Sequence, residues 1–211
     1  MTVIYPLQPG VRVTSPFLDP DYPKFRISAG LPVAEHPGVD YGHPKLRGDQ
    51  ARGFPVVAFA EGEVIHVGNH RVWGNIVALR HDLLAEYLKL DHPLVSLYAH
   101  LAFTSVEVGD YLLAGQPVGS MGAGDPMFRM VTHLHFEIRK DDKLKPDFWP
   151  GANKNLILEK YLDPHEFIKN HYQKENVFYR KQVIILNQPS DAGGLINIQN
   201  KNKAYVRYLK N

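Results

Sequence analysis

The sequence contains no cysteine, and this absence excludes several kinds of site. There can be no disulfide framework, no thiolate nucleophile and no cysteine-bound metal. Any metal ion must therefore be bound by histidine, aspartate or glutamate side chains. Eleven histidines are available for that purpose in a chain of 211 residues.

Net charge is almost absent too, because 24 lysine and arginine residues balance 22 aspartate and glutamate residues to a formal charge of +2. Nucleic-acid-binding proteins usually concentrate basic residues on one face, and this sequence has no basic run. We therefore expect no nucleic acid among the partners.

Long apolar runs are also missing. A membrane-spanning helix needs about 20 consecutive apolar residues, and no such stretch occurs. The opening segment, Met1–Pro6, lacks the basic region and the apolar region of a secretory signal peptide. We expect a chain with no membrane span and no signal peptide in the sequence given, and we leave its oligomeric state open.

What the sequence does contain is a series of short β-branched and aromatic segments separated by glycine and proline, the pattern of an all-β domain. Expected strands lie at 11–17, 54–60, 62–68, 74–81, 95–101 and 132–138. Residues 19–26 are expected to form a loop, since they are rich in Pro, Asp and Tyr. In the strand at 95–101, alternation predicts that Ser96, Tyr98 and His100 point outward.

Helical signals are confined to two places. Good helix formers predict a short insertion within 82–93, and the segment 155–169 predicts one or two short helices, with Pro164 at a helix start. Further strands are expected at 177–186, 195–198 and 204–209. We predict an all-β core of antiparallel sheets, sandwich- or barrel-like, at residues 1–145, and a small mixed α+β C-terminal extension at 146–211.

Three motifs, HPGVD, LYAHL and THLHFEI, place histidines in a pattern that suits chemistry. As a strand, Thr132–Ile138 places His133, His135 and Glu137 on one face and its apolar residues on the other. Two imidazoles two positions apart suit either two metal ligands or one ligand beside a proton-transferring neighbour. In HPGVD, proline and glycine oppose a helix, and an extended chain keeps His36 and Asp40 on one face.

The remaining histidines have no comparable setting, and we interpret them as structural or surface residues: His43, His66, His70, His81, His92, His165 and His171.

Taken in order, seven segments resemble the lysostaphin-type (LytM-like) zinc metallopeptidases, which cut peptidoglycan cross-bridges and stem peptides. They are VTSPF, HPGVDYG, PVVAFAEGEVIHVG, GNIVALRH, LYAHL, VEVGDYLLAGQPVGSMG and HLHFEIRK, between about Gly10 and Arg139. The resemblance implies the duplicated hybrid motif fold of peptidoglycan endopeptidases, with the site in a groove across one sheet.

Position by position, the resemblance implies one zinc ion per chain bound by His36, Asp40 and His135, with His100 and His133 as the unligated catalytic pair. Two histidines and one carboxylate leave a fourth position open for water. No H-E-x-x-H motif is present, so a histidine must act as the base. We expect His133 to orient and deprotonate the water and His100 to hydrogen-bond the developing oxyanion, or the two roles to be exchanged.

Glu137, on the same strand face, is either a partner of a ligand imidazole or a solvated strand residue. The loop 122–131 is longer and more apolar than the Gly/Ser-rich loop usual in the family. Its Met127, Phe128 and Met130 either wall a cleft or pack against the insertion.

The implied function is zinc-dependent endopeptidase hydrolysis of amide bonds in peptidoglycan cross-links or stem peptides, with zinc-activated water as the nucleophile. Which bond is cut stays open between the D-Ala to diamino-acid cross-link and a glycine bridge. Peptidoglycan peptides as substrate imply a periplasmic or extracellular location.

Two alternatives remain. One is a non-catalytic relative that binds peptidoglycan or activates a partner hydrolase; such relatives typically have lost ligands, which this chain retains. The other is a lipoyl-type or sugar-transport phosphocarrier domain, which GEVIHVG and the following turn units also resemble. The turn Gly109–Tyr111 has no lysine to modify, and His36 with Asp40 would have no role there.

Overall fold

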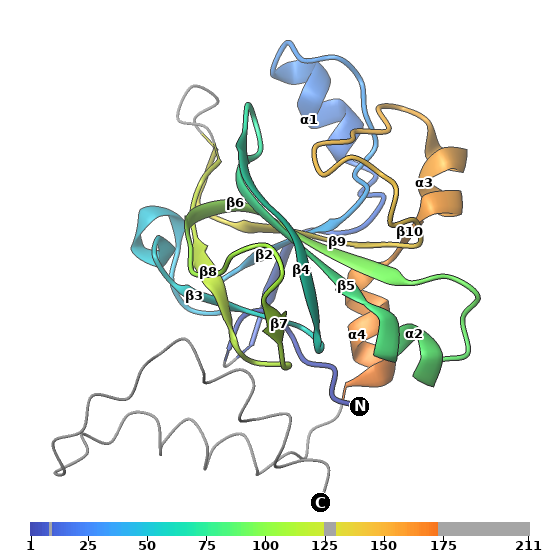
Figure 1. Ribbon diagram of the computed structural model, residues 1–211. Helices are drawn as coiled ribbons and strands as arrows, with labels where there is room; N and C mark the ends of the chain where they lie inside the picture. The colour runs from blue at the N-terminus through green and yellow to red at the C-terminus, as the bar shows by residue number, and fades with distance from the viewer. Residues whose placement is uncertain (9, 125–129, 173–211) are drawn as a thin grey trace, which may run out of the picture. The chain divides into compact units, whose positions relative to one another are not determined.

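The computed structural model describes residues 1–8, 10–124 and 130–172 (Figure 1). The strands predicted at 177–186, 195–198 and 204–209 lie outside these residues, as do Met127 and Phe128. The chain divides into a unit Met1–Gln173 and a unit Lys174–Asn211, and every described residue belongs to the first. The predicted boundary between a core at residues 1–145 and a C-terminal extension at 146–211 stays a prediction.

Within the described residues, ten strands form one sheet, and every strand pair is antiparallel. Seven strands lie side by side in the order β1-β2-β9-β6-β5-β4-β7. The remaining three attach to them: β10 pairs with β9, β8 pairs with β6, and β3 pairs with β8. The ten strands are β1 Arg12–Ser15, β2 Val39–Gly42, β3 Pro55–Val57, β4 Gly62–His70, β5 Gly74–His81, β6 Leu94–Thr104, β7 Tyr111–Leu112, β8 Pro117–Met121, β9 Leu134–Arg139 and β10 Tyr161–Leu162.

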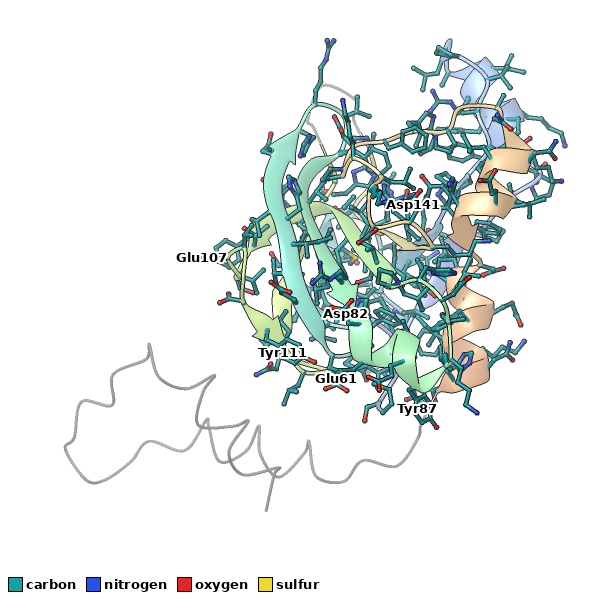
Figure 2. The ribbon with its side chains drawn as sticks, turned by 45° about the vertical axis from the view of Figure 1, so that its right-hand side comes forward. Glu61, Asp82, Tyr87, Glu107, Tyr111 and Asp141 are labelled. Atoms are coloured by element: carbon teal, nitrogen blue, oxygen red, sulfur yellow. The ribbon has the colours of Figure 1, made fainter. Side chains whose placement is uncertain are left out.

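Helices are few and short, so the predicted antiparallel all-β core is confirmed, and the described part of the predicted mixed α+β extension contains two helices and one short strand. They are α1 Tyr22–Ser28, the 3-10 turn Gly48–Ala51, α2 Asp82–Tyr87, α3 Lys154–Lys160 and α4 Pro164–His171. As predicted, α2 falls in the 82–93 insertion and Pro164 begins α4, where the side chain of Asp163 accepts hydrogen bonds from two N–H groups of the first turn. Figure 2 shows Asp82 at the start of α2 and Glu61 close by, at the same end of the sheet.

The loop predicted at 19–26 is wrong, since α1 begins at Tyr22. Pro23 lies in the first turn of α1, where the missing N–H has no intrahelical partner to lose and the fixed φ suits a helix. Proline was therefore compatible with a helix start at this position.

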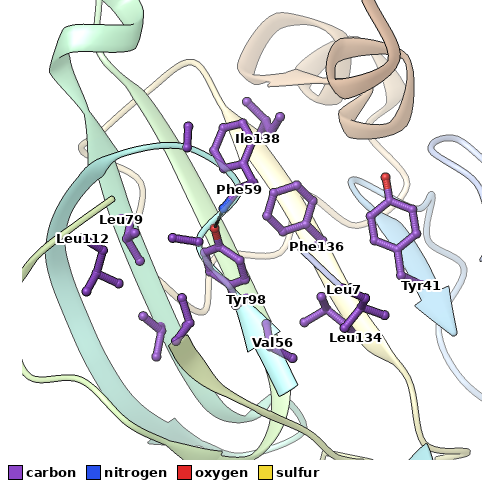
Figure 3. Packing of buried hydrophobic residues seen from close by; sticks show 14 of the residues in the cluster. Leu7, Tyr41, Val56, Phe59, Leu79, Tyr98, Leu112, Leu134, Phe136 and Ile138 are labelled. Carbon is purple, nitrogen blue, oxygen red and sulfur yellow. Dashed lines mark hydrogen bonds between the residues drawn. The ribbon is translucent and has the colours of Figure 1, made fainter. Parts of the chain in front are cut away.

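The core lies on one face of the sheet, where Leu134, Phe136 and Ile138 of β9 are fully buried as predicted. Phe136 packs between Phe59 and Tyr98, with ring centroids 5.5 and 5.1 Å away (Figure 3). The Tyr98 hydroxyl accepts a 2.9 Å hydrogen bond from the N–H of Phe59, which satisfies a polar group inside the core. This packing fixes which face of β9 is left for the site.

The opposite face carries a second, smaller apolar cluster. Its buried members are Trp73, Ile76, Ala78, Val95, Leu97 and Ala99. Ala99 lies directly opposite His135, and Leu97 opposite Glu137, so this cluster shares its face with the polar side of β9.

The prediction that Ser96 and Tyr98 of β6 point outward is wrong, because both side chains are fully buried. The sheet is covered on both faces here, so the alternation of polar and apolar residues does not report which face is solvated. By simple alternation His100 would share the face of Tyr98. The register instead shifts between Asn75 and Val77 of β5, and His100 adopts φ of +60°. This β-bulge turns His100 onto the face of His135.

Among the residues described, no helix is long and apolar enough to cross a membrane.

Candidate metal centre

Three side chains converge at the junction of β2 and β9. The Nε2 atom of His36 lies 3.1 Å from Nδ1 of His135 and 3.2 Å from Oδ1 of Asp40. The same Asp40 oxygen lies 2.9 Å from Nδ1 of His135. Across the described part of the chain, this is the one group of three or more His, Cys, Asp or Glu side chains placed to hold a metal ion.

The register of two strands produces this convergence. Asp40 and His135 are directly opposite each other in the antiparallel pair of β2 and β9. His36 precedes β2, and Gly38 lies between the two ligands in the sequence. A Cβ atom on Gly38 would lie 2.6 Å from the carbonyl oxygen of Phe136, so only glycine lets this segment approach β9 so closely.

Partners outside the triangle formed by His36, Asp40 and His135 orient both imidazoles. Nδ1 of His36 lies 2.8 Å from the carbonyl oxygen of Pro16, which can only accept, so Nδ1 donates and Nε2 turns its lone pair inward. Nε2 of His135 lies 3.0 Å from Oε1 of Glu137 and donates to it, so Nδ1 faces the triangle. Ligand imidazoles in metal sites are held by such partners.

Glu137 is therefore the partner of a ligand imidazole rather than a solvated strand residue, which resolves the alternative left open by the sequence. It is fully buried, and its other carboxylate oxygen accepts a 2.6 Å hydrogen bond from Nε of Arg139. The buried Arg139 guanidinium also donates to the carbonyl oxygens of Lys145 and Pro146, at 2.9 and 3.1 Å. One hydrogen-bonded chain thus connects His135 to the segment that follows β9.

Charge in the triangle is arranged for a cation. Burial raises the pKa of the Asp40 carboxyl, but the imidazoles of His36, His133 and His135 outweigh it and hold the pKa well below the usual range. Burial lowers the pKa of His135, but hydrogen bonds to Asp40 and Glu137 outweigh it and raise the pKa to about 9. In the metal-free protein His135 is protonated between two carboxylates, and a metal ion would displace that proton.

His100 and His133 stand beside the triangle. Their ring centroids are 4.7 Å apart, and that of His100 lies 5.9 Å from the ring of His135. Nδ1 of His100 donates to the Trp73 carbonyl oxygen at 3.1 Å, and Nδ1 of His133 donates to that of Val131 at 2.6 Å. Nε2 of His133 lies 3.7 Å from Oδ2 of Asp40. The structure therefore brings together all five residues selected from the sequence.

An aromatic wall of Tyr22, Trp149 and Trp73 flanks the triangle, and the sequence analysis did not identify it. Tyr22 stacks on His36 at 4.7 Å, and Trp73 meets His135 edge-on at 5.2 Å. Trp149 joins the two, with centroids 6.3 Å from Tyr22 and 5.5 Å from Trp73. One signal in the sequence could have pointed to this wall: Trp73 and Trp149 are the two tryptophans of the chain.

His81 has the structural role that was predicted. It is fully buried, donates from Nδ1 to the Glu61 carbonyl oxygen at 2.7 Å, and accepts at Nε2 from the Ser96 hydroxyl at 2.7 Å. Burial lowers its pKa to about 4.

Comparison with known proteins finds a matching family and several related sequences. The sequence profile of Peptidase family M23 matches residues 34–146, more than half of the chain. The uncharacterized lipoprotein YgeR of Escherichia coli (strain K12) is 28% identical over 113 residues, which are 53% of this chain and 40% of that protein. The murein hydrolase activator NlpD of Salmonella typhimurium is 34% identical over 94 residues, 44% of this chain and 22% of that protein. The chain thus spans less than half the length of these curated relatives.

Solved structures share the fold. A chain in the crystal structure of the SpoIIIAH and SpoIIQ complex aligns with a TM-score of 0.53 at 25% identity, over 79% of this chain and 99% of that chain. Lysostaphin in solution aligns with a TM-score of 0.52 at 23% identity, over 79% of this chain and 54% of that chain.

Proposed function

The chain belongs to peptidase family M23, and we propose that it is a zinc-dependent endopeptidase that hydrolyses amide bonds in peptidoglycan cross-links or stem peptides. The observation that carries this proposal is the convergence of His36, Asp40 and His135 beside two further imidazoles.

Zinc suits this donor set. Two imidazole nitrogens and one carboxylate oxygen are the ligand types of catalytic zinc, which keeps one position open. The three donor atoms lie within 4.8 Å of one another, and within residues 1–8, 10–124 and 130–172 no lysine or arginine side chain forms an ion pair with any of them. When bound, zinc would lower the pKa of a water molecule to roughly 7 and polarise the carbonyl of the scissile amide.

The chain's own residues would manage the protons. The Nδ1 atoms of His100 and His133 are held by backbone carbonyl groups, so each ring presents Nε2 for catalysis. Burial, and then the imidazoles of His133 and His135, lower the pKa of His100, so its Nε2 carries a lone pair that can accept a proton. Nε2 of His133 lies 3.7 Å from the Asp40 carboxylate. We therefore favour the exchanged roles, in which His100 accepts a proton from water and His133 donates to the oxyanion.

A second candidate function is activation of another hydrolase. It is favoured by the relative named murein hydrolase activator NlpD. An activator needs no turnover, so an activator function does not explain why the His100 and His133 rings lie beside the triangle. For this reason we place it second.

We also propose a periplasmic or extracellular location, because two of the related proteins are named lipoproteins and the proposed substrate lies outside the cytoplasm.

The test is digestion of purified peptidoglycan from one diaminopimelate-type wall and one glycine-bridged wall, with and without a zinc chelator, and with the products identified by mass spectrometry. We expect chelator-sensitive release of uncross-linked peptides, whose masses name the bond. His100→Ala serves as the inactive control. Zinc-loaded protein that releases nothing from either wall would contradict the peptidase proposal. Stimulation of a separate murein hydrolase by that same protein would support the activator.

A further inference from the structure

A second pair of histidines lies on the same face of the sheet as the metal centre. His66 and His70 project from β4, and their Nε2 atoms are 2.9 Å apart. The cross-strand partner of His66 is Ala78, a member of the smaller apolar cluster on the face of His135. Two imidazole nitrogens at this separation are spaced as adjacent ligands of one metal ion are.

The pair is separate from the metal centre. Between β9 and β4 lie β6 and β5, so three strand spacings of about 4.8 Å put the two sites roughly 14 Å apart. Apolar side chains, among them Ile76 and Ala99, occupy the sheet face between them. A ligand at His66 and His70 would not touch His36, Asp40 or His135.

Gly68 makes room for the two rings. It lies between His66 and His70 on the same face of β4. A Cβ atom at this position would lie 2.8 Å from Nε2 of His66 and 3.1 Å from Nε2 of His70. A larger residue would push at least one ring away, so the absence of a side chain permits the approach of the two nitrogens.

A carboxylate lies behind one ring. Oδ2 of Asp147 is 3.5 Å from Nδ1 of His70, which favours a hydrogen on Nδ1 and leaves the lone pair of Nε2 directed at His66. In metal sites, a carboxylate commonly accepts the N–H of the imidazole whose other nitrogen binds the metal, and Asp147 and His70 have this arrangement.

We propose that His66 and His70 form a second site for a divalent transition-metal ion, with Zn²⁺ or Cu²⁺ bound by the two Nε2 atoms and by water, and with Asp147 orienting His70. Imidazole is a preferred ligand of both ions. With two protein ligands the site binds more weakly than the three-ligand centre. This site does not depend on the proposed peptidase function.

The site would also fasten a segment beside the metal centre. Asp147 lies two residues before Trp149, whose ring packs on Trp73 of the aromatic wall. An ion bound at His66 and His70 would strengthen the hold of β4 on this segment through Asp147.

Calorimetric titration of the zinc-free 211-residue chain with Zn²⁺ tests the site. We expect two binding events in the wild type and one, of unchanged affinity, in the double variant His66→Gln/His70→Gln. His92→Gln, a surface histidine control, should retain both events. Asp147→Asn should weaken the second event up to about tenfold, and Gly68→Ala should weaken it as well.

A measurement on the wild type removes any dependence on variant folding. In long-range ¹H–¹⁵N spectra, the first equivalent of Zn²⁺ should shift the imidazole nitrogens of His36 and His135. The second should shift those of His66 and His70. A single binding event in the wild type, a second event that survives the double variant, or a second equivalent that leaves the His66 and His70 nitrogens unshifted would each overturn the proposal.

Discussion

Asp40 and His135 lie directly opposite each other in the antiparallel pair of β2 and β9, with Oδ1 of Asp40 2.9 Å from Nδ1 of His135. Two residues 95 positions apart in the sequence thus form one edge of the proposed zinc triangle. A slip of one residue in this register would turn His135 into the core and Leu134 or Phe136 toward Asp40. The geometry of the centre is therefore a property of strand pairing.

Replacing His100 by alanine should leave zinc affinity within about twofold of the wild type and lower kcat by roughly 10²–10⁴-fold, since the ring is aimed at the site without contributing to the triangle. Zinc content measured by elemental analysis and peptide release measured by mass spectrometry separate the two effects. Loss of zinc from this variant would show that His100 is a ligand. His133→Ala should behave in the same way.

Replacing Glu137 by glutamine should weaken zinc binding about 10–100-fold, because Glu137 accepts the hydrogen bond that orients His135. The variant also leaves the buried Arg139 guanidinium without its carboxylate, which should cost about 3–5 kcal/mol of unfolding free energy. Competition with a fluorescent chelator gives the affinity, and urea unfolding of the zinc-free protein gives the stability. Glu107→Gln, at the exposed surface site labelled in Figure 2, is the matched control and should change neither quantity. Equal zinc affinity in Glu137→Gln and the wild type would contradict the orienting role.

Replacing Gly38 by alanine should push the segment between His36 and Asp40 away from β9, because the added Cβ would lie 2.6 Å from the Phe136 carbonyl oxygen and 2.9 Å from Cγ of Glu137. We expect a loss of about 1–3 kcal/mol of unfolding free energy and a zinc affinity at least tenfold lower. Gly10→Ala is the matched control, since its added Cβ would meet nothing within 4 Å. If Gly38→Ala and Gly10→Ala gave the same zinc affinity, close approach at Gly38 would not matter for the centre.

Stability should fall in mild acid because of His81. Burial lowers the pKa of His81 to about 4, below its ordinary value of 6.5, so the unfolded chain takes up a proton before the folded protein does. The contribution of this residue is complete above pH 6.5 and is lost as the pH falls toward 4, by about 3 kcal/mol in total. Urea unfolding of the zinc-free protein between pH 7 and pH 4.5 measures it.

The matched variant for this prediction is His81→Asn, which can still donate to the Glu61 carbonyl group but does not titrate. Its unfolding free energy should decline by about 2–3 kcal/mol less than that of the wild type over the same pH range. Ser96→Ala, which removes one hydrogen bond and keeps the imidazole, should retain most of the wild-type slope. Parallel curves for the wild type and His81→Asn would rule out His81 as the source.

The family, the antiparallel all-β fold and the five side chains that lie together in the structure could all be predicted from the sequence. The fold could be predicted because strand segments alternate with turns. The site could be predicted because HPGVD and THLHFEI each place metal-binding side chains on one face of an extended chain, and the family because the motifs occur in the same order as in its members. The face of β9 that enters the core also followed from its alternation, since Leu134, Phe136 and Ile138 are uniformly apolar.

The remaining features of the site arise from the tertiary structure. It turned His100 toward His133 by a β-bulge with a positive φ, which depends on how β5 and β6 pair and is not encoded in the alternation of β6. It also chose between the two interpretations of Glu137, because burial beside Arg139 arises from the segment that folds over the strand. The positions of Tyr22 and Trp73 against His36 and His135 likewise join distant parts of the chain. Periodicity describes one strand at a time, whereas these contacts depend on which strands and loops meet.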